Sequence, residues 1–262
     1  MKIALILSYE GTNYNGFQRQ REKQSDKVAI QNVLEDILSD LYKLSVETIG
    51  ASRTDAGVHA LCQVVTYEQE NLLPVDKIAI ILNKKLPLDI RVVKSFEVSL
   101  DFHPRYSKSC KTYEYKIFYG EALNPLYRNF VLHKKGIYNI KLLQLGCERL
   151  IGTHDFKGFS NKSDINSTIR TIFYAGFYEK DGYLTFTITG DGFLYNMVRI
   201  IVSTLLDIGE GKKNIKVLDE IFLTKNRNLG SATAKAFPLI LKEIKYNDDL
   251  YKVTPENISF SL

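Results

Sequence analysis

The sequence predicts an α+β protein made of two similar βαββαβ (ferredoxin-like) halves. Alternating apolar and polar residues indicate short strands, whereas apolar residues spaced three and four apart indicate helices. The order of these elements in residues 1–106 is repeated in residues 107–262. We therefore expect an N-terminal and a C-terminal half whose strands form one shared, mostly antiparallel sheet, with helices on one face and a cleft at the seam.

The N-terminal half begins with a buried strand at residues 2–9, which ends at the turn-forming stretch EGTNYNG. An amphipathic helix follows, for which Ser25 and Asp26 are the candidate N-caps. Its apolar face comprises Ile30, Val33, Leu34, Ile37, Leu38 and Leu41. Two short strands near 45–50 and 61–68, a helix near 75–85 and a strand near 90–97 complete this half.

The C-terminal half begins with a strand at residues 111–119, where four alternate aromatic or aliphatic side chains share one face. A helix near 139–151 precedes two strands at 169–179 and 183–190. An apolar helix at 194–208, a shorter helix near 214–224 and a last strand at 239–246 follow. The helix at 194–208 is additional to the βαββαβ order.

Composition excludes several classes of protein. The balance of 45% hydrophobic and 25% charged residues is typical of a globular chain, and no apolar run approaches the roughly 20 residues of a membrane span. The scattered Cys62, Cys110 and Cys147 form no disulfide or zinc motif, which suits the reducing cytoplasm. A net charge of +5 is compatible with a phosphate-bearing partner. We expect neither a cofactor nor a metal.

The stretch SRTDAGVH, between two predicted strands, is the first candidate for chemistry. One interpretation is a turn in which Asp55 bonds to its own backbone and Arg53 is solvated. The other is a catalytic carboxylate on a rigid loop beside a cleft, with Arg53 placed to hold a phosphate. The pattern alone leaves both open.

The helix at 194–208 supplies the second candidate. It is apolar on two opposite sides, so that Arg199 is drawn out of bulk water and needs a partner. A salt bridge to Asp55 would keep that carboxylate ionised, as a nucleophile must be. The alternative is an Arg199 that extends its guanidinium into solvent.

The strand at 111–119 supplies the third. Tyr113 and Tyr115 share a face next to Lys108 and Lys111, where one tyrosine could stack on a base or accept a proton. The other tyrosines of this strand suit the core. All four histidines suit structural roles, and no Walker, GxGxxG or GxSxG motif is present.

Several ordered motifs together resemble the TruA-type tRNA pseudouridine synthase family. They are the opening loop, which has Phe17 where Trp is usual, the stretch around Asp55, the segment at the junction of the halves, and two later motifs: YEGTNYNGFQRQ, GASRTDAGVHA, DFHPRYSKSCKTYEYKI, GTHDFKGFS and GFLYNMVRIIV. The resemblance extends along nearly the whole chain. The C-terminal GSATAKAFPLIL departs from the usual AGxTAPAxGLYL, which bears on substrate identity.

The resemblance implies the pseudouridine synthase fold and a cofactor-free, cytoplasmic homodimer that isomerises uridine in RNA. The expected substrate is the anticodon stem-loop of tRNA (positions 38–40); another RNA such as ribosomal RNA, or RNA binding without catalysis, is the alternative. Asp55 maps onto the catalytic aspartate, Tyr113 onto the stacking tyrosine and Arg199 onto the arginine paired with the aspartate. A basic track for RNA is expected from Arg19, Arg53, Arg105, Lys108, Lys111 and Arg170.

Overall fold

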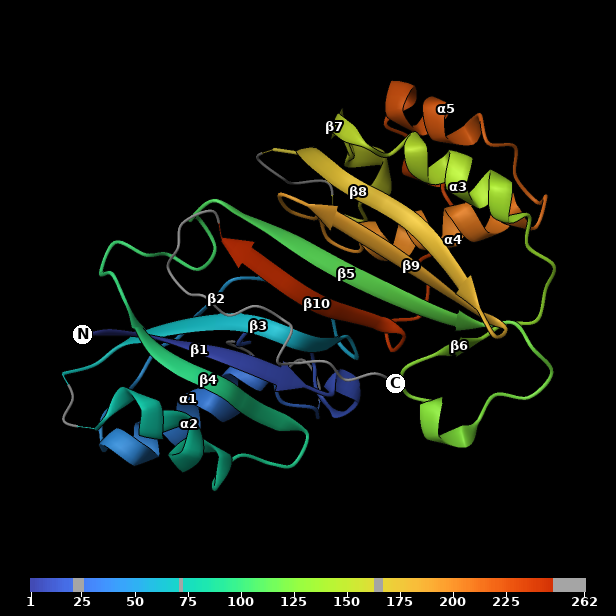
Figure 1. Cartoon of the computed structure of the whole chain (residues 1–262). Helices are drawn as coiled ribbons and strands as arrows, with labels where there is room; N and C mark the ends of the chain where they lie inside the picture. The colour runs from blue at the N-terminus through green and yellow to red at the C-terminus, as the bar shows by residue number, and fades with distance from the viewer. Residues whose placement is uncertain (21–25, 71–72, 163–166, 247–262) are drawn as a thin grey trace. The chain divides into compact units, whose positions relative to one another are not determined.

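A computed structural model describes residues 1–20, 26–70, 73–162 and 167–246 (Figure 1). The chain forms two compact units. The first unit comprises Met1–Ser109 together with Leu241–Leu262, and the second comprises Cys110–Ile240. Among the described residues, 241–246 thus group with the N-terminal part of the chain, although they follow the second unit in sequence. In the described part of the chain, no helix is long and apolar enough to cross a membrane.

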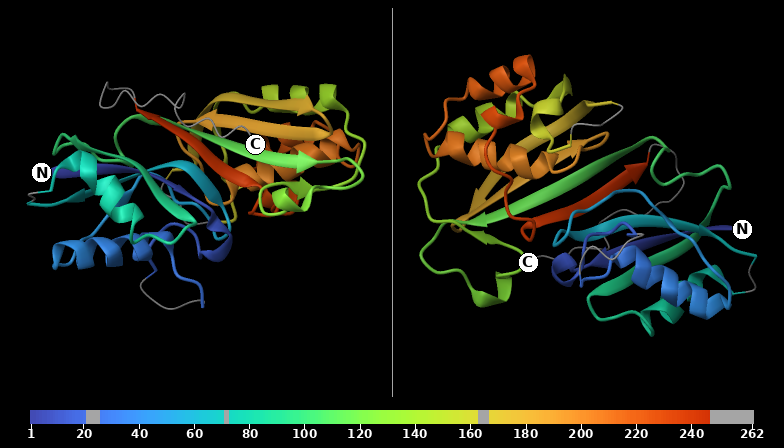
Figure 2. Two further views of the ribbon diagram at one scale, coloured as in Figure 1. Left: turned by 60° about the horizontal axis from the view of Figure 1, so that its bottom comes forward. Right: turned by 180° about the vertical axis from the view of Figure 1, so that it is seen from behind.

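The first unit has an antiparallel sheet with β1 (Lys2–Tyr9) between β3 (His59–Glu68) and β4 (Ile90–Val98). The two-residue β2 (Ile49–Gly50) pairs with the end of β3. β1 is buried along nearly its whole length, as its continuous apolar sequence predicts. The helices α1 (Ile30–Tyr42) and α2 (Val75–Asn83) lie side by side on one face of the sheet (Figures 1 and 2).

The start of α1 differs from the prediction. Asp26 lies outside the helix, Ser25 lies outside the described residues, and Ala29 occupies the N-cap without a side-chain hydrogen bond. The first N–H groups of the helix are instead satisfied by backbone carbonyls of the preceding loop, because Ile30 donates to Gly16 (3.1 Å) and the next residue donates to Phe17 (2.9 Å). A helix terminus satisfied in this way needs no capping side chain.

The second unit has an antiparallel sheet in the order β5-β9-β8-β7. Its strands are β5 (Ser109–Phe118), β7 (Gly152–Asp155), β8 (Ile169–Lys180) and β9 (Tyr183–Gly190), and β6 (Leu132–His133) pairs parallel with β5. The alternation predicted for β9 is confirmed: Leu184, Phe186 and Ile188 are fully buried, and the threonines between them are not.

Three helices accompany this sheet: α3 (Ile140–Glu148), α4 (Met197–Gly209) and α5 (Val217–Thr224). Two glycines allow α3 and α4 to approach closely. A Cβ on Gly146 of α3 would lie 2.6 Å from Leu205 of α4, and one on Gly209 of α4 would lie 2.6 Å from Leu143 of α3. This reciprocal fit packs leucine of one helix against the backbone of the other.

The last strand, β10 (Leu239–Tyr246), straddles the boundary between the units, and its larger part belongs to the first unit. There the backbone of Ile244 bonds the Cys62 thiol of β3, and the Tyr246 ring meets Phe102 edge-on at 5.0 Å. Tyr246 also donates its hydroxyl to the carbonyl of Pro104 (2.5 Å). These contacts explain why the end of β10 groups with the first unit.

The predicted α+β class with mostly antiparallel strands is confirmed, and every predicted helix and strand is present. The short β6 and β7 were not expected. Four single-turn 3-10 helices, η1 (Gly11–Asn13), η2 (Pro125–Tyr127), η3 (Lys157–Phe159) and η4 (Arg227–Leu229), were not expected either. These elements contain two to four residues, too few to give a periodic pattern.

Candidate active-site loop and its supports

Asp55 lies in the loop between β2 and β3, residues 51–58, which we call the Asp55 loop. Its backbone carbonyl accepts the N–H of Val58 (3.0 Å), and Gly57 takes a positive φ of 80° inside this turn. Thr54 and Val58 are buried, Asp55 is half-buried, and Arg53 is exposed. The loop thus points its arginine outward while its alternate residues anchor it to the protein.

Buried hydrogen bonds hold the N-terminal part of this loop. The Gln63 side chain of β3 accepts the N–H of Ser52 (3.1 Å) and donates to the carbonyl of Ser52 (2.7 Å). Ala51 donates to the carbonyl of Val64 (2.8 Å). Next to Asp55, the Thr54 hydroxyl bonds the Tyr9 hydroxyl at the end of β1 (2.8 Å). Buried polar groups paired so completely give a loop of fixed shape.

A second loop, residues 11–19 after β1, packs against the Asp55 loop, and we call it the opening loop. Phe17 donates its N–H to the carbonyl of Thr54 (3.1 Å), and Gly11 donates to Nδ1 of the buried His59 (2.9 Å). The Phe17 ring is buried against Gly50, where a Cβ would come within 2.2 Å of it. His59 therefore has the structural role expected for it.

Close backbone contact requires glycine at Gly16. Its φ is +77°, and a Cβ there would lie 2.6 Å from the carbonyl oxygen of Thr54 and 3.2 Å from the carbonyl carbon of Asp55. Only glycine combines a left-handed backbone with such an approach. The opening loop is thus in van der Waals contact with the backbone of Asp55 itself.

Two arginines gather beside the Asp55 loop. Arg105 donates to the carbonyl of Gly50 (3.3 Å), and its pKa is lowered by burial and by the positive charge of Arg53. Neither guanidinium forms an ion pair with a carboxylate within the described ranges of the chain. Two adjacent unneutralised cations favour an anion such as a phosphate. Lys108, nearby in sequence, is exposed.

Arg199 lies in the second unit, in the first turn of α4. Its Nε donates to the carbonyl of Ala234 (2.8 Å), and Ala234 donates back to the carbonyl of Arg199 (3.3 Å). The side chain is therefore half-buried and tethered to a backbone segment. Its charge acts on the buried Tyr115, whose pKa is raised by desolvation and lowered only partly by Arg199.

The segment that tethers Arg199, residues 232–235, contacts one turn of α4 and one residue of β5. Ala232 accepts the Ser203 hydroxyl (2.6 Å), Ala234 bonds Arg199, and Lys235 accepts the Tyr115 hydroxyl (3.1 Å). In each of these contacts the segment contributes backbone atoms only. The segment lies within GSATAKAFPLIL, residues 230–241, which departs from the family pattern.

The two candidate tyrosines differ in their surroundings. Tyr115 is fully buried, and its hydroxyl is bonded to Lys235, so it is a core residue. Tyr113 is 6% exposed, and its ring meets Phe193 edge-on at 5.2 Å. Of the neighbouring lysines, Lys111 is buried. Tyr113 therefore fits a partly accessible aromatic position better than Tyr115 does.

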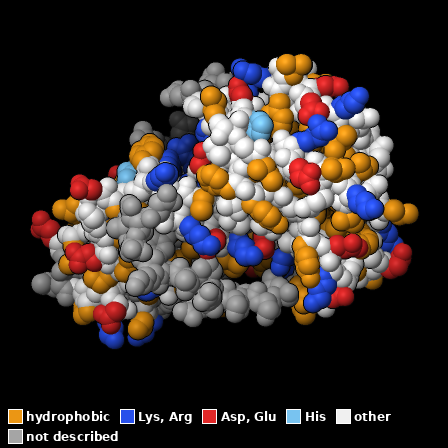
Figure 3. Space-filling model, turned by 45° about the horizontal axis from the view of Figure 1, so that its top comes forward, with side chains coloured by type: hydrophobic (Ala, Val, Ile, Leu, Met, Phe, Trp, Pro, Cys, Tyr) orange, Lys and Arg blue, Asp and Glu red, His pale blue; other side chains and the backbone are white. Residues whose placement is uncertain are grey.

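The other predicted RNA-binding residues have contacts of their own. Arg19 forms ion pairs with Glu35 and Glu47, both 3.2 Å, so that its charge is neutralised within the first unit. Arg170 of β8 donates to the carbonyls of Ser167 (3.1 Å) and Ile169 (2.5 Å). On the face drawn in Figure 3, basic side chains are interspersed with acidic ones, so no uniform basic surface covers that face.

The structure brings Arg53 and Arg105 together in the first unit, and Arg199 and Tyr115 in the second. The pairing of Asp55 with Arg199 stays a prediction. Sequence reasoning missed the parts of Gly16, Phe17 and Thr54 in holding the Asp55 loop. A signal was present in the opening stretch EGTNYNGF, whose two glycines and final aromatic residue indicate close backbone contact.

Comparison with known proteins shows the family of this chain. A family model described as "tRNA pseudouridine synthase" matches residues 5–107 and 147–247. The tRNA pseudouridine synthase A 2 of Clostridium tetani (strain Massachusetts / E88) is 37% identical over 246 residues, which cover 94% of this chain and 98% of that protein. The tRNA pseudouridine synthase A of Streptococcus pyogenes serotype M49 (strain NZ131) is 41% identical over 255 residues, covering 95% and 100%.

Among solved structures, a Cbf5-Nop10-Gar1 complex aligns with 78% of this chain and 45% of its own chain, at a TM-score of 0.34 and 10% identity. A likeness this weak supports no inference. The family model, in contrast, matches most of the chain, and the two curated relatives match it nearly from end to end. The chain belongs to the tRNA pseudouridine synthase family.

Proposed function

We propose that this protein isomerises uridine to pseudouridine in tRNA, with Asp55 as its catalytic carboxylate. The observation that carries the proposal is the construction of the Asp55 loop, in which buried bonds at Ser52 and Thr54 fix the backbone on the N-terminal side of a half-buried carboxylate. A nucleophile has to be held in a productive geometry, and a merely acidic turn would not need such anchoring.

The reaction breaks the bond between C1′ of the ribose and N1 of uracil and forms a bond between C1′ and C5. The C5 proton leaves, and N1 gains a proton, so no electrons are exchanged with a cofactor. An ionised Asp55 can attack C1′, attack C6, or assist elimination. We further propose that a salt bridge to Arg199 keeps Asp55 ionised.

The detached uracil must stay in a closed pocket while it turns. We assign its stacking to Tyr113, which is almost buried and already has the Phe193 ring against its edge. The target nucleotide must leave its stack before it can react. The guanidinium groups of Arg53 and Arg105 suit the phosphates flanking a nucleotide displaced in this way.

The anticodon stem-loop (positions 38–40) is the proposed target, because the resemblance to the TruA-type family implies this region of tRNA as well as the reaction. Both curated relatives are named for tRNA, which favours tRNA over ribosomal RNA. We propose that the enzyme works in the cytoplasm as a homodimer. The free thiols of Cys62, Cys110 and Cys147 suit a reducing compartment, and sedimentation of the purified enzyme would test the dimer.

The test of the chemistry is release of tritium from tRNA labelled at C5 of uridine. The wild type should release it, and Asp55→Asn, which keeps the shape of the side chain, should release none above background while still binding tRNA. Equal release by both proteins would remove Asp55 from the mechanism. Incubation with ribosomal RNA in parallel tests the alternative substrate.

The role of the arginine pair is tested separately. Arg53→Gln and Arg105→Gln should each weaken tRNA binding, and each should reduce the slope of log Kd against log salt by about one. Lys180→Gln, in the second unit, is the control for an ordinary exposed cation of β8. An unchanged salt slope in both arginine variants would exclude phosphate contacts for this pair.

A further inference from the structure

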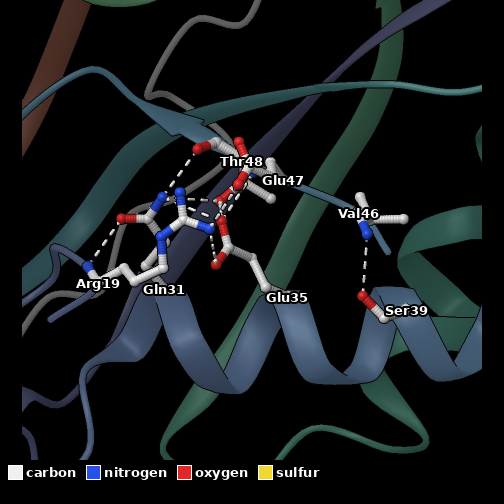
Figure 4. Close-up of polar contacts among 7 residues, drawn as sticks. All are labelled: Arg19, Gln31, Glu35, Ser39, Val46, Glu47 and Thr48. Atoms are coloured by element: carbon white, nitrogen blue, oxygen red, sulfur yellow. Dashed lines mark hydrogen bonds and ion pairs between the residues drawn. The ribbon is translucent and has the colours of Figure 1, made fainter. Parts of the chain in front are cut away.

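A polar network centred on Glu35 of α1 joins this helix to Arg19 of the opening loop and to Thr48 (Figure 4). The Glu35 carboxylate accepts the N–H of Thr48 (2.8 Å), the Thr48 hydroxyl (3.0 Å), the Gln31 amide (3.2 Å) and the Arg19 guanidinium (3.2 Å). Gln31 also donates to the carbonyl of Thr48 (2.8 Å). Glu47 bonds the same nitrogen of Arg19 from the outside, also at 3.2 Å.

This network differs from an ordinary surface ion pair in its burial. The Glu35 side chain is 9% exposed, whereas that of Glu47 is 75% exposed. A buried carboxylate with four donors is costly to disturb, because removing one partner leaves charge or polar groups without solvation. An exposed pair contributes little. The Glu35 side of the network therefore fixes Arg19, and the Glu47 side does not.

The network fixes the opening loop at successive backbone positions. The Gln31 side chain accepts the N–H of Arg19 (2.8 Å), and the Gln31 backbone N–H donates to the carbonyl of Phe17 (2.9 Å). One residue earlier, the N–H of Ile30 donates to the carbonyl of Gly16 (3.1 Å). The start of α1 thus holds residues 16–19 through both its backbone and its side chains.

The opening loop in turn holds the Asp55 loop. Phe17 donates its N–H to the carbonyl of Thr54, the residue before Asp55, and Gly16 touches the backbone of both. A continuous series of hydrogen bonds and backbone contacts therefore connects Glu35 on α1 with the backbone of Asp55. Every link in this series lies within the first unit.

We propose that Arg19, Gln31 and Glu35 are positioning residues, which hold the opening loop against the Asp55 loop and so fix the Asp55 carboxylate for attack. The assignment rests on the proposed function of Asp55. It gives Arg19 a task other than binding RNA, since its guanidinium is occupied by Glu35. A displacement of about 1 Å at a reacting group can reduce a rate about 100-fold, so loosening this network should lower kcat.

Glu35→Gln is the sharpest test. Its remaining carbonyl oxygen can still accept both Thr48 donors, but its new amide nitrogen cannot accept from Arg19, so that the bond to Arg19 is lost while those to Thr48 are kept. Glu47→Gln is the matched control, because it removes a partner of the same nitrogen at the same distance on the exposed side. Glu210→Gln controls for stability, since that side chain is 8% exposed and pairs with Lys134 at 2.5 Å in the second unit.

Kinetics of tritium release, measured at saturating and subsaturating tRNA, distinguish a positioning role of Arg19 from an RNA-binding role. We expect Glu35→Gln to lower kcat about 10- to 100-fold with KM for tRNA within about twofold. Arg19→Met should lower kcat in the same way, and Arg19→Lys, which keeps a cation for Glu35, should recover part of the loss. Glu47→Gln and Glu210→Gln should retain kcat within about twofold, although Glu210→Gln lowers the melting temperature.

Three results would overturn the proposal. The first is a wild-type kcat in both Glu35→Gln and Arg19→Met. The second is a raised KM with unchanged kcat in Arg19→Met, which would make Arg19 an RNA ligand. The third is an equal loss of kcat in Glu210→Gln, which would mean general loosening. Asp55→Asn, assayed alongside, keeps the two proposals apart: if it is fully active, the proposed function fails, whatever the network variants do.

Discussion

Replacing Gly16 with Ala should lower the stability of the protein and the activity of the Asp55 loop more than the same change at a glycine with free space around it. Its φ of +77° strains an alanine by about 1–2 kcal/mol. The new Cβ would lie 2.6 Å from the Thr54 carbonyl oxygen, so the loops must separate by about 0.4 Å to reach the 3.0 Å limit of real contacts. Overlap of this kind adds about 1–3 kcal/mol. The total loss of unfolding free energy is about 2–5 kcal/mol.

Gly211→Ala is the matched control, because Gly211 has a φ of +74° and nothing within 4 Å of the added Cβ. It should lose only the strain energy, about 1–2 kcal/mol. Chemical denaturation measures both losses, and tritium release from tRNA measures activity. Gly16→Ala should lower kcat about 10-fold or more and Gly211→Ala should not. Equal stability and equal kcat in the two variants would refute the close approach of the loops.

Three further predictions follow from single side chains. Tyr9→Phe leaves the buried Thr54 hydroxyl without its partner and should lower the unfolding free energy by about 1 kcal/mol in urea titrations, whereas an unchanged midpoint would deny the bond. Burial tends to raise the pKa of Asp155, but its hydrogen bonds, first that from Lys225, outweigh this and lower the pKa from 3.8 to about 2. Asp155→Asn should therefore be less stable than the wild type above about pH 4, and the difference should vanish as pH falls towards 2; a difference independent of pH would contradict the ion pair. Burial raises the pKa of Cys147 to about 12, so iodoacetamide at pH 8 should alkylate it in denatured but not in native protein, as mass spectrometry can check.

Most of the fold follows from the periodicity of the sequence. β9 alternates apolar residues with threonines, and the apolar face of α1 repeats at helical spacing, so both elements could be located without tertiary information. The start of α1 could not. The first N–H groups of the helix bond the carbonyls of Gly16 and Phe17, which lie well before the helix in sequence. The residues next to the helix start therefore gave no sign of this arrangement, and the prediction of a capping side chain was wrong.

The candidate site was predicted only in part, for a similar reason. The motif around Asp55 identified the loop, but the groups that hold it are backbone atoms of Gly16 and Phe17 and the side chains of Tyr9 and Gln63. Contacts made by a backbone leave no mark on residue type beyond an occasional glycine. Arg19 is the converse case: a cation in a polar stretch suggested RNA, and the two carboxylates that pair with it are too distant in sequence for the pattern to show them.

The segment that docks along α4 has a consequence for how this family can evolve. Ala232 and Lys235 accept from Ser203 and Tyr115 through their carbonyls, and Ala234 bonds Arg199 through both its carbonyl and its N–H, so that among these three positions proline would remove a bond only at Ala234. Mutational drift in these side chains is therefore cheap, whereas insertion or deletion of one residue would shift every bond out of register. Lys235 stands where the family pattern AGxTAPAxGLYL has proline, and a carbonyl at that position can accept the Tyr115 hydroxyl from either residue, whereas relatives should agree in the length of this segment.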